Sequence, residues 1–428
     1  MDALAAIPKY DTYKDSGSNW LGEIPRDWGV TKFKYLARVR KGKIPKRIVS
    51  ENNSNLPAYL SMEYLRGSEA NQFVEDKNPV LVEDGSILLL WDGSNAGEFI
   101  LGKRGVVSST LASIDFFSVT EKFAWYACQV TEMQLRSATV GMGIPHVDGN
   151  QLKNSFLAIP SIADQKLIAN FLDNKTTQIE DAISIKEKQI ALLKERKQII
   201  IQKAVTQGLN PDVPMKDSGV EWIGKIPAHW DLKPLYAVLE FISYGFTNPM
   251  PTEEDGPYML TSNDIGDGYI KYESSRRTSF ASFKLKLSMK SKPTIGDLLV
   301  TKDGTLGRTA LVRSDDKMCI SQSVALLRFK KVLVNEFVEL AFRAYKYQEK
   351  MILDAGGTTI KHIYISRLAK MKVALPPLKE QKCIVEKLDF RISEIDTACN
   401  LLSQQLETLK EYKATLINSA VTGKIKVV

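Results

Sequence analysis

Two stretches of the chain concentrate basic side chains in a way that suits contact with phosphate groups. Lys32–Arg47, "KFKYLARVRKGKIPKR", holds eight Lys and Arg residues and no acidic residue. Lys271–Lys292 holds seven basic residues against one acid, Glu273, and both stretches carry Phe and Tyr between the charges. Clustered cations interleaved with aromatic rings are typical of nucleic-acid surfaces, although a solvated protein face remains the alternative interpretation.

Side-chain patterns that could support catalysis are much weaker. "GEFILGKR" at Gly97–Arg104 approaches a phosphate-binding loop, but an arginine replaces the Ser or Thr that would bind magnesium. The four cysteines form no C-x-x-C pair, and His146, His229 and His362 are far apart in the sequence, so no metal site is indicated. The chain also lacks a serine-nucleophile elbow. We therefore expect a binding protein rather than an enzyme.

The composition sets limits on the class of protein. A chain of 428 residues usually forms two or more domains, and 44% apolar with 25% charged residues is typical of a globular protein. The net charge of +8 favours an anionic partner. No apolar run approaches the roughly 18 residues of a membrane helix, and the first residues lack the layout of a signal peptide. We expect a cytoplasmic protein with no membrane partner.

One short phrase occurs twice in the chain. "KDSGSNWLGEIPRDW" at Lys14–Trp28 and "KDSGVEWIGKIPAHW" at Lys216–Trp230 are identical at nine of fifteen positions, where chance predicts about one. The phrase is too short for a domain and too polar for a core strand. We therefore predict that it forms a joint and that the chain contains two equivalent modules.

A second, longer repeat closes each half of the chain. Ile159–Thr206 and Leu375–Thr422 align without a gap and are identical at 17 of 48 positions. Each copy begins with an apolar residue followed by proline, or by two prolines in the second copy, and then runs without proline or glycine until Gly208 or Gly423. A proline at the start and a glycine just past the end are typical of a helix, so the repeat predicts two long helices.

Apolar residues in both predicted helices recur at alternating steps of four and three, which is the period of a coiled coil. A narrow apolar stripe of this length needs a partner helix, and each copy is the natural partner of the other. The predicted interface residues are Leu172, Ile179, Ile183, Ile190, Leu193, Ile200, Leu388, Ile392, Ile395, Leu402, Leu406, Leu409 and Leu416. Lys197 and Lys413 fall at equivalent places in the two stripes, so we expect the helices to splay near their C-terminal ends.

The two repeats divide the chain into four segments. We predict the first joint and globular domain in residues 1–158, a long helix in 159–209, the second joint and globular domain in 210–374, and the second long helix in 375–428. Apolar runs between turns, with short helices near Ala124–Arg136 and Asn335–Lys350, indicate a mixed fold in each globular domain. The predicted fold class is α/β (mixed α+β), with an internal pseudo-two-fold repeat and two long antiparallel coiled-coil helices.

A basic chain with two globular domains, two long helices and a doubled joint resembles the specificity (S) subunit of type I restriction–modification systems. The resemblance rests on the two "KDSG" phrases with their Trp, Ile-Pro and Trp residues, the proline-led helix starts, the heptad stripes, and the "AVTQG" and "AVTGK" ends. Together these motifs span the whole chain.

The resemblance implies a division of labour among subunits. Each globular domain would be a target-recognition domain that reads one half of a bipartite site in double-stranded DNA. The helices would space the two halves and dock two methyltransferase (M) subunits. S-adenosylmethionine would belong to the M subunits, and ATP and Mg²⁺ to the restriction (R) subunits, so this chain would hold no cofactor and no catalytic residue. It would act in the cytoplasm, associated with the nucleoid through DNA.

Basic side chains of such a domain would hold phosphates, and residues in turns would reach the edges of bases. An Asp-Gly turn follows each of two predicted buried strands, in Gly85–Gly97 and Gly296–Gly307, and His146 and His362 hold matching positions in later turns. The candidate DNA-contacting residues of the first domain are Lys41, Lys43, Lys46, Arg47, Asp92, Ser94 and His146. Those of the second domain are Arg276, Arg277, Lys302, Asp303, Arg308, Lys361 and His362.

Three other functions are compatible with parts of the pattern. A self-contained DNA enzyme would need motifs that the sequence lacks. A coiled-coil adaptor that binds no DNA would leave the two basic stretches unexplained. A two-headed transcriptional regulator without a methyltransferase partner accounts for most of the same features and is the main alternative.

Overall fold

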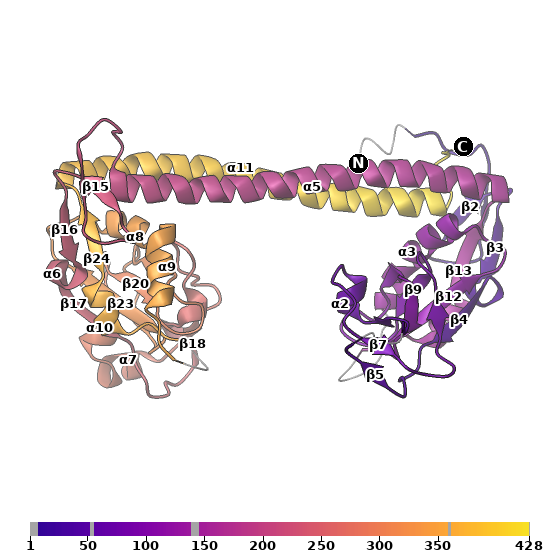
Figure 1. Cartoon of the computed structure of the whole chain (residues 1–428), viewed down its shortest axis with the longest axis horizontal. Helices are drawn as coiled ribbons and strands as arrows, with labels where there is room; N and C mark the ends of the chain where they lie inside the picture. The colour runs from indigo at the N-terminus through magenta and orange to yellow at the C-terminus, as the bar shows by residue number, and fades with distance from the viewer. Residues whose placement is uncertain (1–6, 52–54, 138–144, 358–360, 428) are drawn as a thin grey trace. The chain divides into compact units, whose positions relative to one another are not determined.

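The computed structural model describes residues 7–51, 55–137, 145–357 and 361–427, and the chain divides into two compact units. Unit 1 comprises Met1–Glu187 and Gln404–Val428, and unit 2 comprises Lys188–Ser403. Each unit contains one globular part and a portion of both long helices, α5 and α11 (Figure 1). The mixed α+β class predicted from the sequence is confirmed.

The globular part of unit 1 is built on a four-stranded antiparallel sheet in the order β10-β9-β12-β4 and a three-stranded sheet in the order β6-β11-β8. Three two-stranded pairs, β1-β2, β13-β3 and β5-β7, complete it. The strands are β1 (Tyr13–Asp15), β2 (Glu23–Pro25), β3 (Gly29–Lys32), β4 (Ala37–Lys41), β5 (Ile48–Val49), β6 (Tyr59–Leu60), β7 (Phe73–Val74), β8 (Leu81–Val82), β9 (Ile87–Leu90), β10 (Phe99–Leu101), β11 (Gly105–Val107), β12 (Leu111–Phe116) and β13 (Phe156–Ile159).

The globular part of unit 2 follows the same plan, with a four-stranded sheet in the order β17-β23-β20-β21 and a three-stranded sheet in the order β19-β18-β22. Two-stranded pairs β14-β15 and β16-β24 correspond to β1-β2 and β13-β3. The strands are β14 (Met215–Asp217), β15 (Lys225–Pro227), β16 (Asp231–Pro234), β17 (Leu239–Tyr244), β18 (Glu253–Leu260), β19 (Arg276–Arg277), β20 (Leu298–Thr301), β21 (Thr309–Leu311), β22 (Met318–Ile320), β23 (Val324–Phe329) and β24 (Lys372–Leu375).

The equivalent strands explain where the core of each globular part lies. β9 in unit 1 and β20 in unit 2 are apolar or Thr at every position and are buried throughout, as expected for a strand covered on both faces. Each is followed by a short connection to an edge strand, β10 or β21, and pairs on its other side with β12 or β23. The internal repeat predicted from the joints and helices therefore extends into the sheets.

Short helices surround the sheets. They are α2 (Met62–Leu65), α3 (Glu121–Ser137), α4 (Gly149–Asn154), α6 (Leu235–Val238), α7 (Phe280–Lys286), α8 (Asn335–Arg343), α9 (Tyr345–Leu353) and α10 (Ile365–Lys370), with the 3-10 turns η1 (Phe33–Tyr35), η2 (Ser262–Asp264) and η3 (Met289–Ser291). The single helix predicted near Asn335–Lys350 is wrong, because Ala344 has ψ of 141° and separates α8 from α9. Ala344 is fully buried, so packing rather than a proline or glycine sets this break. No helix in the described ranges is long and apolar enough to cross a bilayer.

In each four-stranded sheet, the strand that comes first in the sequence, β4 or β17, is followed by a glycine, because the backbone of another segment lies against that glycine. A Cβ added to Gly42, after β4, would lie 2.1 Å from the carbonyl oxygen of Ser108. A Cβ added to Gly245, after β17, would lie 1.7 Å from the carbonyl oxygen of Ile320. Only glycine permits this approach, and it occurs at equivalent positions of the two units.

The two long helices pair in an antiparallel direction within each unit. α5 spans Ile162–Gln207 and α11 spans Leu378–Val421. In unit 1, Leu172 near the start of α5 shares a core cluster with Leu416 near the end of α11. In unit 2, Ile201 near the end of α5 shares a cluster with Ile384 near the start of α11. All thirteen residues predicted for the interface are buried or half-buried.

Two ion pairs at equivalent positions of the repeat lie across the helix pair. Lys197 Nζ is 2.7 and 2.8 Å from the carboxylate oxygens of Asp396 in unit 2, and Lys413 Nζ is 2.5 Å from Glu180 in unit 1. The predicted splaying of the helices is therefore wrong. The lysines are neutralised by carboxylates of the opposite helix, and beyond Lys197 the chain stays packed, with Val205 fully buried.

Each copy of the repeated phrase forms a small antiparallel hairpin against the end of a long helix. Trp28 of the first copy is buried beside Gly423, which follows α11. Trp230 of the second copy is buried beside Gly208, which follows α5. The first joint therefore seats the end of the second helix, and the second joint seats the end of the first. The phrase is repeated because each unit contains one such seat.

Candidate nucleic-acid interface

A cluster of polar and aromatic side chains lies at the end of the buried strand β9 in unit 1. The strand is followed by Trp91 and Asp92, and Asp92 forms a β-bridge with His146 from a later loop. Lys41, the last residue of β4, reaches past β12 and places its Nζ 2.9 Å from a carboxylate oxygen of Asp92. The same Nζ lies 5.4 Å from the centre of the Trp91 ring, within the range of a cation–π contact.

Unit 2 has an equivalent cluster at the end of β20. The strand is followed by Lys302 and Asp303, and Asp303 forms a β-bridge with His362. Lys302 Nζ is 2.7 Å from a carboxylate oxygen of Asp303 and 5.6 Å from the centre of the ring of Tyr244, the last residue of β17. The His362 ring packs edge-on against Tyr364, with 4.2 Å between the ring centres.

The cation and the ring exchange places between the two clusters. In unit 1 the cation, Lys41, ends the outer strand and the ring, Trp91, follows the buried strand. In unit 2 the ring, Tyr244, ends the outer strand and the cation, Lys302, follows the buried strand. The Asp and the His keep their positions. One scaffold therefore presents the same groups in a different arrangement, and the Lys41 side chain is 45% exposed against 14% for Lys302.

The chemistry of these clusters suits base edges as well as phosphates. A lysine can donate to the O6 and N7 atoms of guanine, a carboxylate can accept from the amino group of cytosine, and an apolar ring surface can contact the methyl group of thymine. A lysine held by a carboxylate loses part of its attraction for phosphate, but it is fixed in direction. The clusters are therefore better suited to directional contacts than a free surface lysine is.

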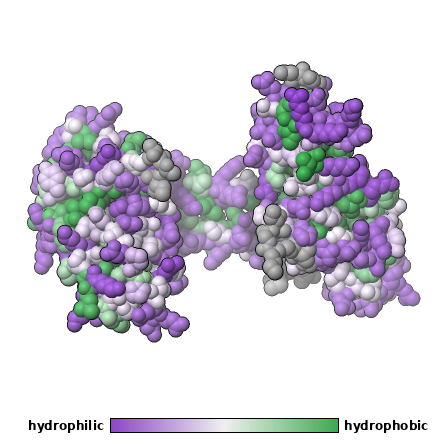
Figure 2. All heavy atoms as spheres, turned by 90° about the horizontal axis from the view of Figure 1, so that it is seen from below, coloured by the Kyte–Doolittle hydropathy of each residue, from purple (hydrophilic) through white to green (hydrophobic). Residues whose placement is uncertain are grey.

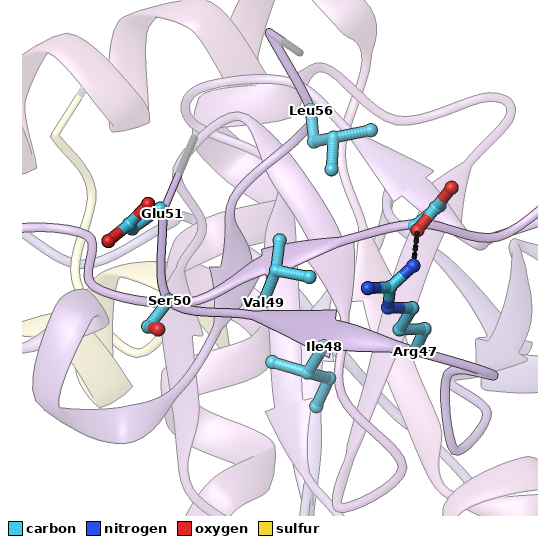
Figure 3. Close-up of a pocket in the computed structure, with 7 residues that line it drawn as sticks. Arg47, Ile48, Val49, Ser50, Glu51 and Leu56 are labelled. Carbon is cyan, nitrogen blue, oxygen red and sulfur yellow. Dashed lines mark hydrogen bonds and ion pairs between the residues drawn. The ribbon is translucent and has the colours of Figure 1, made fainter. Parts of the chain in front are cut away.

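The other residues predicted for the first domain do not join this cluster by any described contact. Ser94, Lys43 and Lys46 are exposed. The backbone N–H of Lys46 donates to Asp76 over 3.2 Å, which lowers the pKa of that carboxyl. Arg47 is paired with Glu75 at 3.1 Å, and the pair lies in an open pocket on β5 together with Ile48 and Val49 (Figure 3).

The residues predicted for the second domain separate into exposed and engaged groups. Arg276 and Lys361 are exposed. Arg277 is half-buried, and its guanidinium donates to the hydroxyl of Tyr258 at 2.7 Å and stacks 4.1 Å from the centre of that ring. Arg308 is half-buried, and its backbone N–H donates to the hydroxyl of Thr301. Arg277 therefore supports the fold, whereas Arg276 is available to a ligand.

Sequence reasoning missed Trp91 and Tyr244, which complete the two clusters. The predicted residues Lys41 and Lys302 are not equivalent in the repeat, and aligning the two halves does not show that each of them contacts an aromatic ring. The strand order shows these contacts, because β4 and β9 both flank β12, and β17 and β20 both flank β23.

Figure 2 shows that hydrophilic residues predominate on the face viewed there, with smaller apolar patches between them.

The structure gives no support to the phosphate-loop resemblance at Gly97–Arg104. The turn Gly102–Arg104 connects β10 to β11 rather than to a helix, and Lys103 Nζ donates to the carbonyl oxygen of Tyr64 at 2.8 Å. Within the described ranges no group of three or more His, Cys, Asp or Glu residues could hold a metal ion. Burial raises the pKa of the Cys128 thiol well above its usual value, which makes it a poor nucleophile.

Comparison with known proteins identifies relatives of the whole chain. The type I restriction modification DNA specificity domain matches residues 25–194 and 253–409. The chain is 30% identical to the type I restriction enzyme MjaVIII specificity subunit of Methanocaldococcus jannaschii, over 94% of both proteins. It is 23% identical to the type I restriction enzyme EcoBI specificity subunit of Escherichia coli, over 71% of this chain and 66% of that protein.

A solved structure shares the fold. A chain from a study of complex assembly and conformational transition of the type I R-M system matches with a TM-score of 0.69 at 15% sequence identity. The match covers 93% of this chain and 98% of that chain, so both globular parts and both long helices have counterparts in it.

Proposed function

The chain belongs to the family of the type I restriction modification DNA specificity domain, which it carries twice, and we propose that its two units read the two halves of one bipartite DNA site. The globular part of unit 1 reads one half and that of unit 2 reads the other. α5 and α11 set the unread gap and dock methyltransferase subunits. The complex acts in the cytoplasm.

The exchange of cation and ring between the two clusters carries this proposal. Two identical reading domains would select a palindromic site, because a two-fold arrangement presents the same side chains to each half. In this chain Lys41 and Trp91 in one unit replace Tyr244 and Lys302 in the other at matching places on the same scaffold. The two units therefore present different donors and apolar surfaces, and the site that they read is not a palindrome.

Exposed lysines and arginines supply the contacts that do not depend on sequence. Lys43 and Lys46 in unit 1 and Arg276 in unit 2 are exposed and belong to the two basic stretches. We assign them to phosphates, where they would hold the register of each unit on the duplex. The Asp-paired lysines of the clusters would then meet the base edges.

Large apolar side chains on the outside of the helix pair support docking of the methyltransferase subunits. Leu192 and Ile199 of α5, both in unit 2, are seven residues apart and are 64% and 48% exposed. Phe390 and Leu401 of α11 are 64% and 55% exposed. Residues at heptad spacing lie on one face, so this stripe offers a seat for a further helix beside the one that the two helices already bury.

Catalysis in this proposal belongs to the partners. The methyltransferase subunits would hold S-adenosylmethionine, and the restriction subunits would hold ATP and Mg²⁺. This chain would supply recognition and spacing.

Two matched variants test the assignment of the halves. We expect Lys41→Ala to relax or abolish recognition of one half-site and Lys302→Ala to affect the other, when each full chain is combined with its methyltransferase subunits and the methylated motif is mapped. Uniform loss of methylation at all sites in both variants would show that these lysines contact only phosphates. A wild-type chain that binds a bipartite site without any methyltransferase partner would favour the transcriptional regulator.

A further inference from the structure

Unit 2 contains a strongly basic pocket of about 370 Å³ away from the cluster described above. It is lined by Trp222 of the second joint, Lys350 and Asp354 at the end of α9, Arg367 and Lys370 of α10, and Lys372 at the start of β24. Four of the side chains that line the pocket are cationic and one is a carboxylate. Trp222 is held in place because its ring packs edge-on against the fully buried Tyr347, with 4.8 Å between the ring centres.

The single carboxylate does not neutralise the pocket. Asp354 accepts from Lys350 Nζ at 2.7 Å through its side chain, and its backbone carbonyl accepts from the Arg367 guanidinium. Within the part of the chain that the structure describes, no acidic side chain pairs with Lys370 or Lys372. Like charges held together without a counter-ion repel one another, so the pocket favours an anion.

None of the residues that line the corresponding pocket in unit 1 is charged, and the nearby cation there is Lys32, whose Nζ lies 5.3 Å from the centre of the Phe156 ring. This pocket is lined by Trp20 of the first joint, Gln134, Gln151 and Phe156, among others. The 216-residue offset of the helix repeat also relates α4 to α10 and β13 to β24, and it places these last three positions opposite Lys350, Arg367 and Lys372, and Asn154 opposite Lys370. Four neutral residues in one unit are therefore four cations in the other. Because unit 1 forms a pocket at the corresponding place with neutral lining residues, the cations of unit 2 are not required by the fold.

We propose that this basic pocket binds a backbone phosphate of the DNA beside the half-site read by unit 2, a contact that unit 1 does not make. The inference rests on the proposed function. α10 joins the pocket to the reading cluster: His362 lies just before the helix, and Arg367 and Lys370 lie on it. Its six residues span about 9 Å, which is about three steps of 3.4 Å along a DNA strand.

The asymmetry favours DNA over an acidic protein surface. Two copies of one methyltransferase subunit would meet the two units through equivalent surfaces, and these pockets are not equivalent in charge. The two halves of a bipartite site differ, and so do their flanks. A solvent-open pocket lined by lysines and an arginine suits a phosphate of a duplex, which can reach it from outside.

The repeat supplies the variants for a test. Arg367→Gln with Lys370→Asn places in unit 2 the residues that unit 1 has at these positions, so the fold should be preserved and thermal melting checks this. We expect the slope of log affinity against log salt to become shallower by about 0.9, for one lost phosphate contact, with Lys370→Asn alone acting in the same direction. Hydroxyl-radical footprinting of the complex should lose protection only on the flank of the half-site read by unit 2.

Matched controls separate the possible outcomes. Lys387→Gln removes an exposed lysine of α11 in unit 2 and should leave the slope unchanged. Unchanged slope and footprint in the Arg367→Gln, Lys370→Asn variant overturn the proposal. Unchanged DNA binding with weaker binding of the methyltransferase subunit also overturns it and assigns the pocket to an acidic protein partner. Failure of the proposed function itself would be visible in the wild-type complex, which would then methylate no bipartite motif.

Discussion

Arg276 and Arg277 are neighbours on β19, yet the structure assigns them different tasks, and separate alanine substitutions should show it. Arg276 is exposed, and no side chain within the described ranges pairs with it. Arg277 is held by the Tyr258 ring and hydroxyl and by the carbonyl oxygen of Gly256. We therefore expect Arg276→Ala to weaken DNA binding with little change in stability, and Arg277→Ala to destabilise unit 2.

The magnitudes follow from these contacts. Loss of one phosphate contact lowers the slope of log affinity against log salt by about 0.9. When the salt concentration rises fourfold, both proteins lose affinity for DNA. The factor by which the affinity falls should be about 3.5 times smaller for Arg276→Ala than for the wild-type chain. Arg277→Ala removes a cation–π contact and charge-assisted hydrogen bonds at a half-buried site, which should lower the free energy of unfolding by about 1–3 kcal/mol.

Fluorescence anisotropy of a labelled duplex carrying the mapped motif, at 50 to 200 mM salt, measures the first effect, and urea denaturation measures the second. Arg277→Lys is a useful control, because it keeps the charge but loses the planar stacking and the paired donors. An unchanged slope in Arg276→Ala would show that the basic stretch of unit 2 is a solvated face. Full stability in Arg277→Ala would refute the structural role that we assign to it.

Three further predictions concern the helices and their seats. Inserting one heptad after Lys188 in α5 and another after Gln404 in α11 keeps both stripes in phase and adds about 10 Å, so the unread gap of the methylated motif should grow by about three base pairs; a fixed gap with methylation retained would contradict the spacing role. A fragment ending at Gly208 has an unpartnered stripe and should pair with itself and, with methyltransferase subunits, methylate a palindrome, whereas a well-folded monomer by light scattering would count against it. Gly423→Ala and Gly208→Ala both place an alanine in the left-handed region of backbone conformation, which should lower the free energy of unfolding by about 1–2 kcal/mol each. Only Gly423→Ala also brings a Cβ within 2.3 Å of Pro25, so urea denaturation should show a further loss of about 1–3 kcal/mol for this variant.

Features encoded in short or periodic patterns could be predicted from the sequence. The steps of four and three predicted the buried stripes of both helices, because the helical period is local and an apolar stripe must be covered. The duplicated phrase predicted two equivalent modules, and each forms the same hairpin in the structure. The family resemblance rested on these same motifs, and the family is confirmed over most of the chain.

The charges along the helices show where pattern reading fails. From Lys197, which interrupts an apolar stripe, we predicted that the helices splay. The prediction failed because the pattern of one helix does not identify the residue that faces it on the other helix. The partner of Lys197, Asp396, is almost 200 residues away, and only the antiparallel register brings the two together. A half-buried lysine is compatible with a packed interface when a carboxylate meets it there.

By itself, the sequence determined the repeat, the two helices, the absence of recognisable catalytic motifs, and the two basic stretches. Only the tertiary structure decided which of those basic residues are available, because Arg277 is engaged and Arg276 is not. It also decided which residues form the reading clusters, since Lys41 meets Trp91 through a sheet in which β12 separates their strands. Strand order and register depend on long-range packing of the whole sheet, and a local pattern of residues does not specify them.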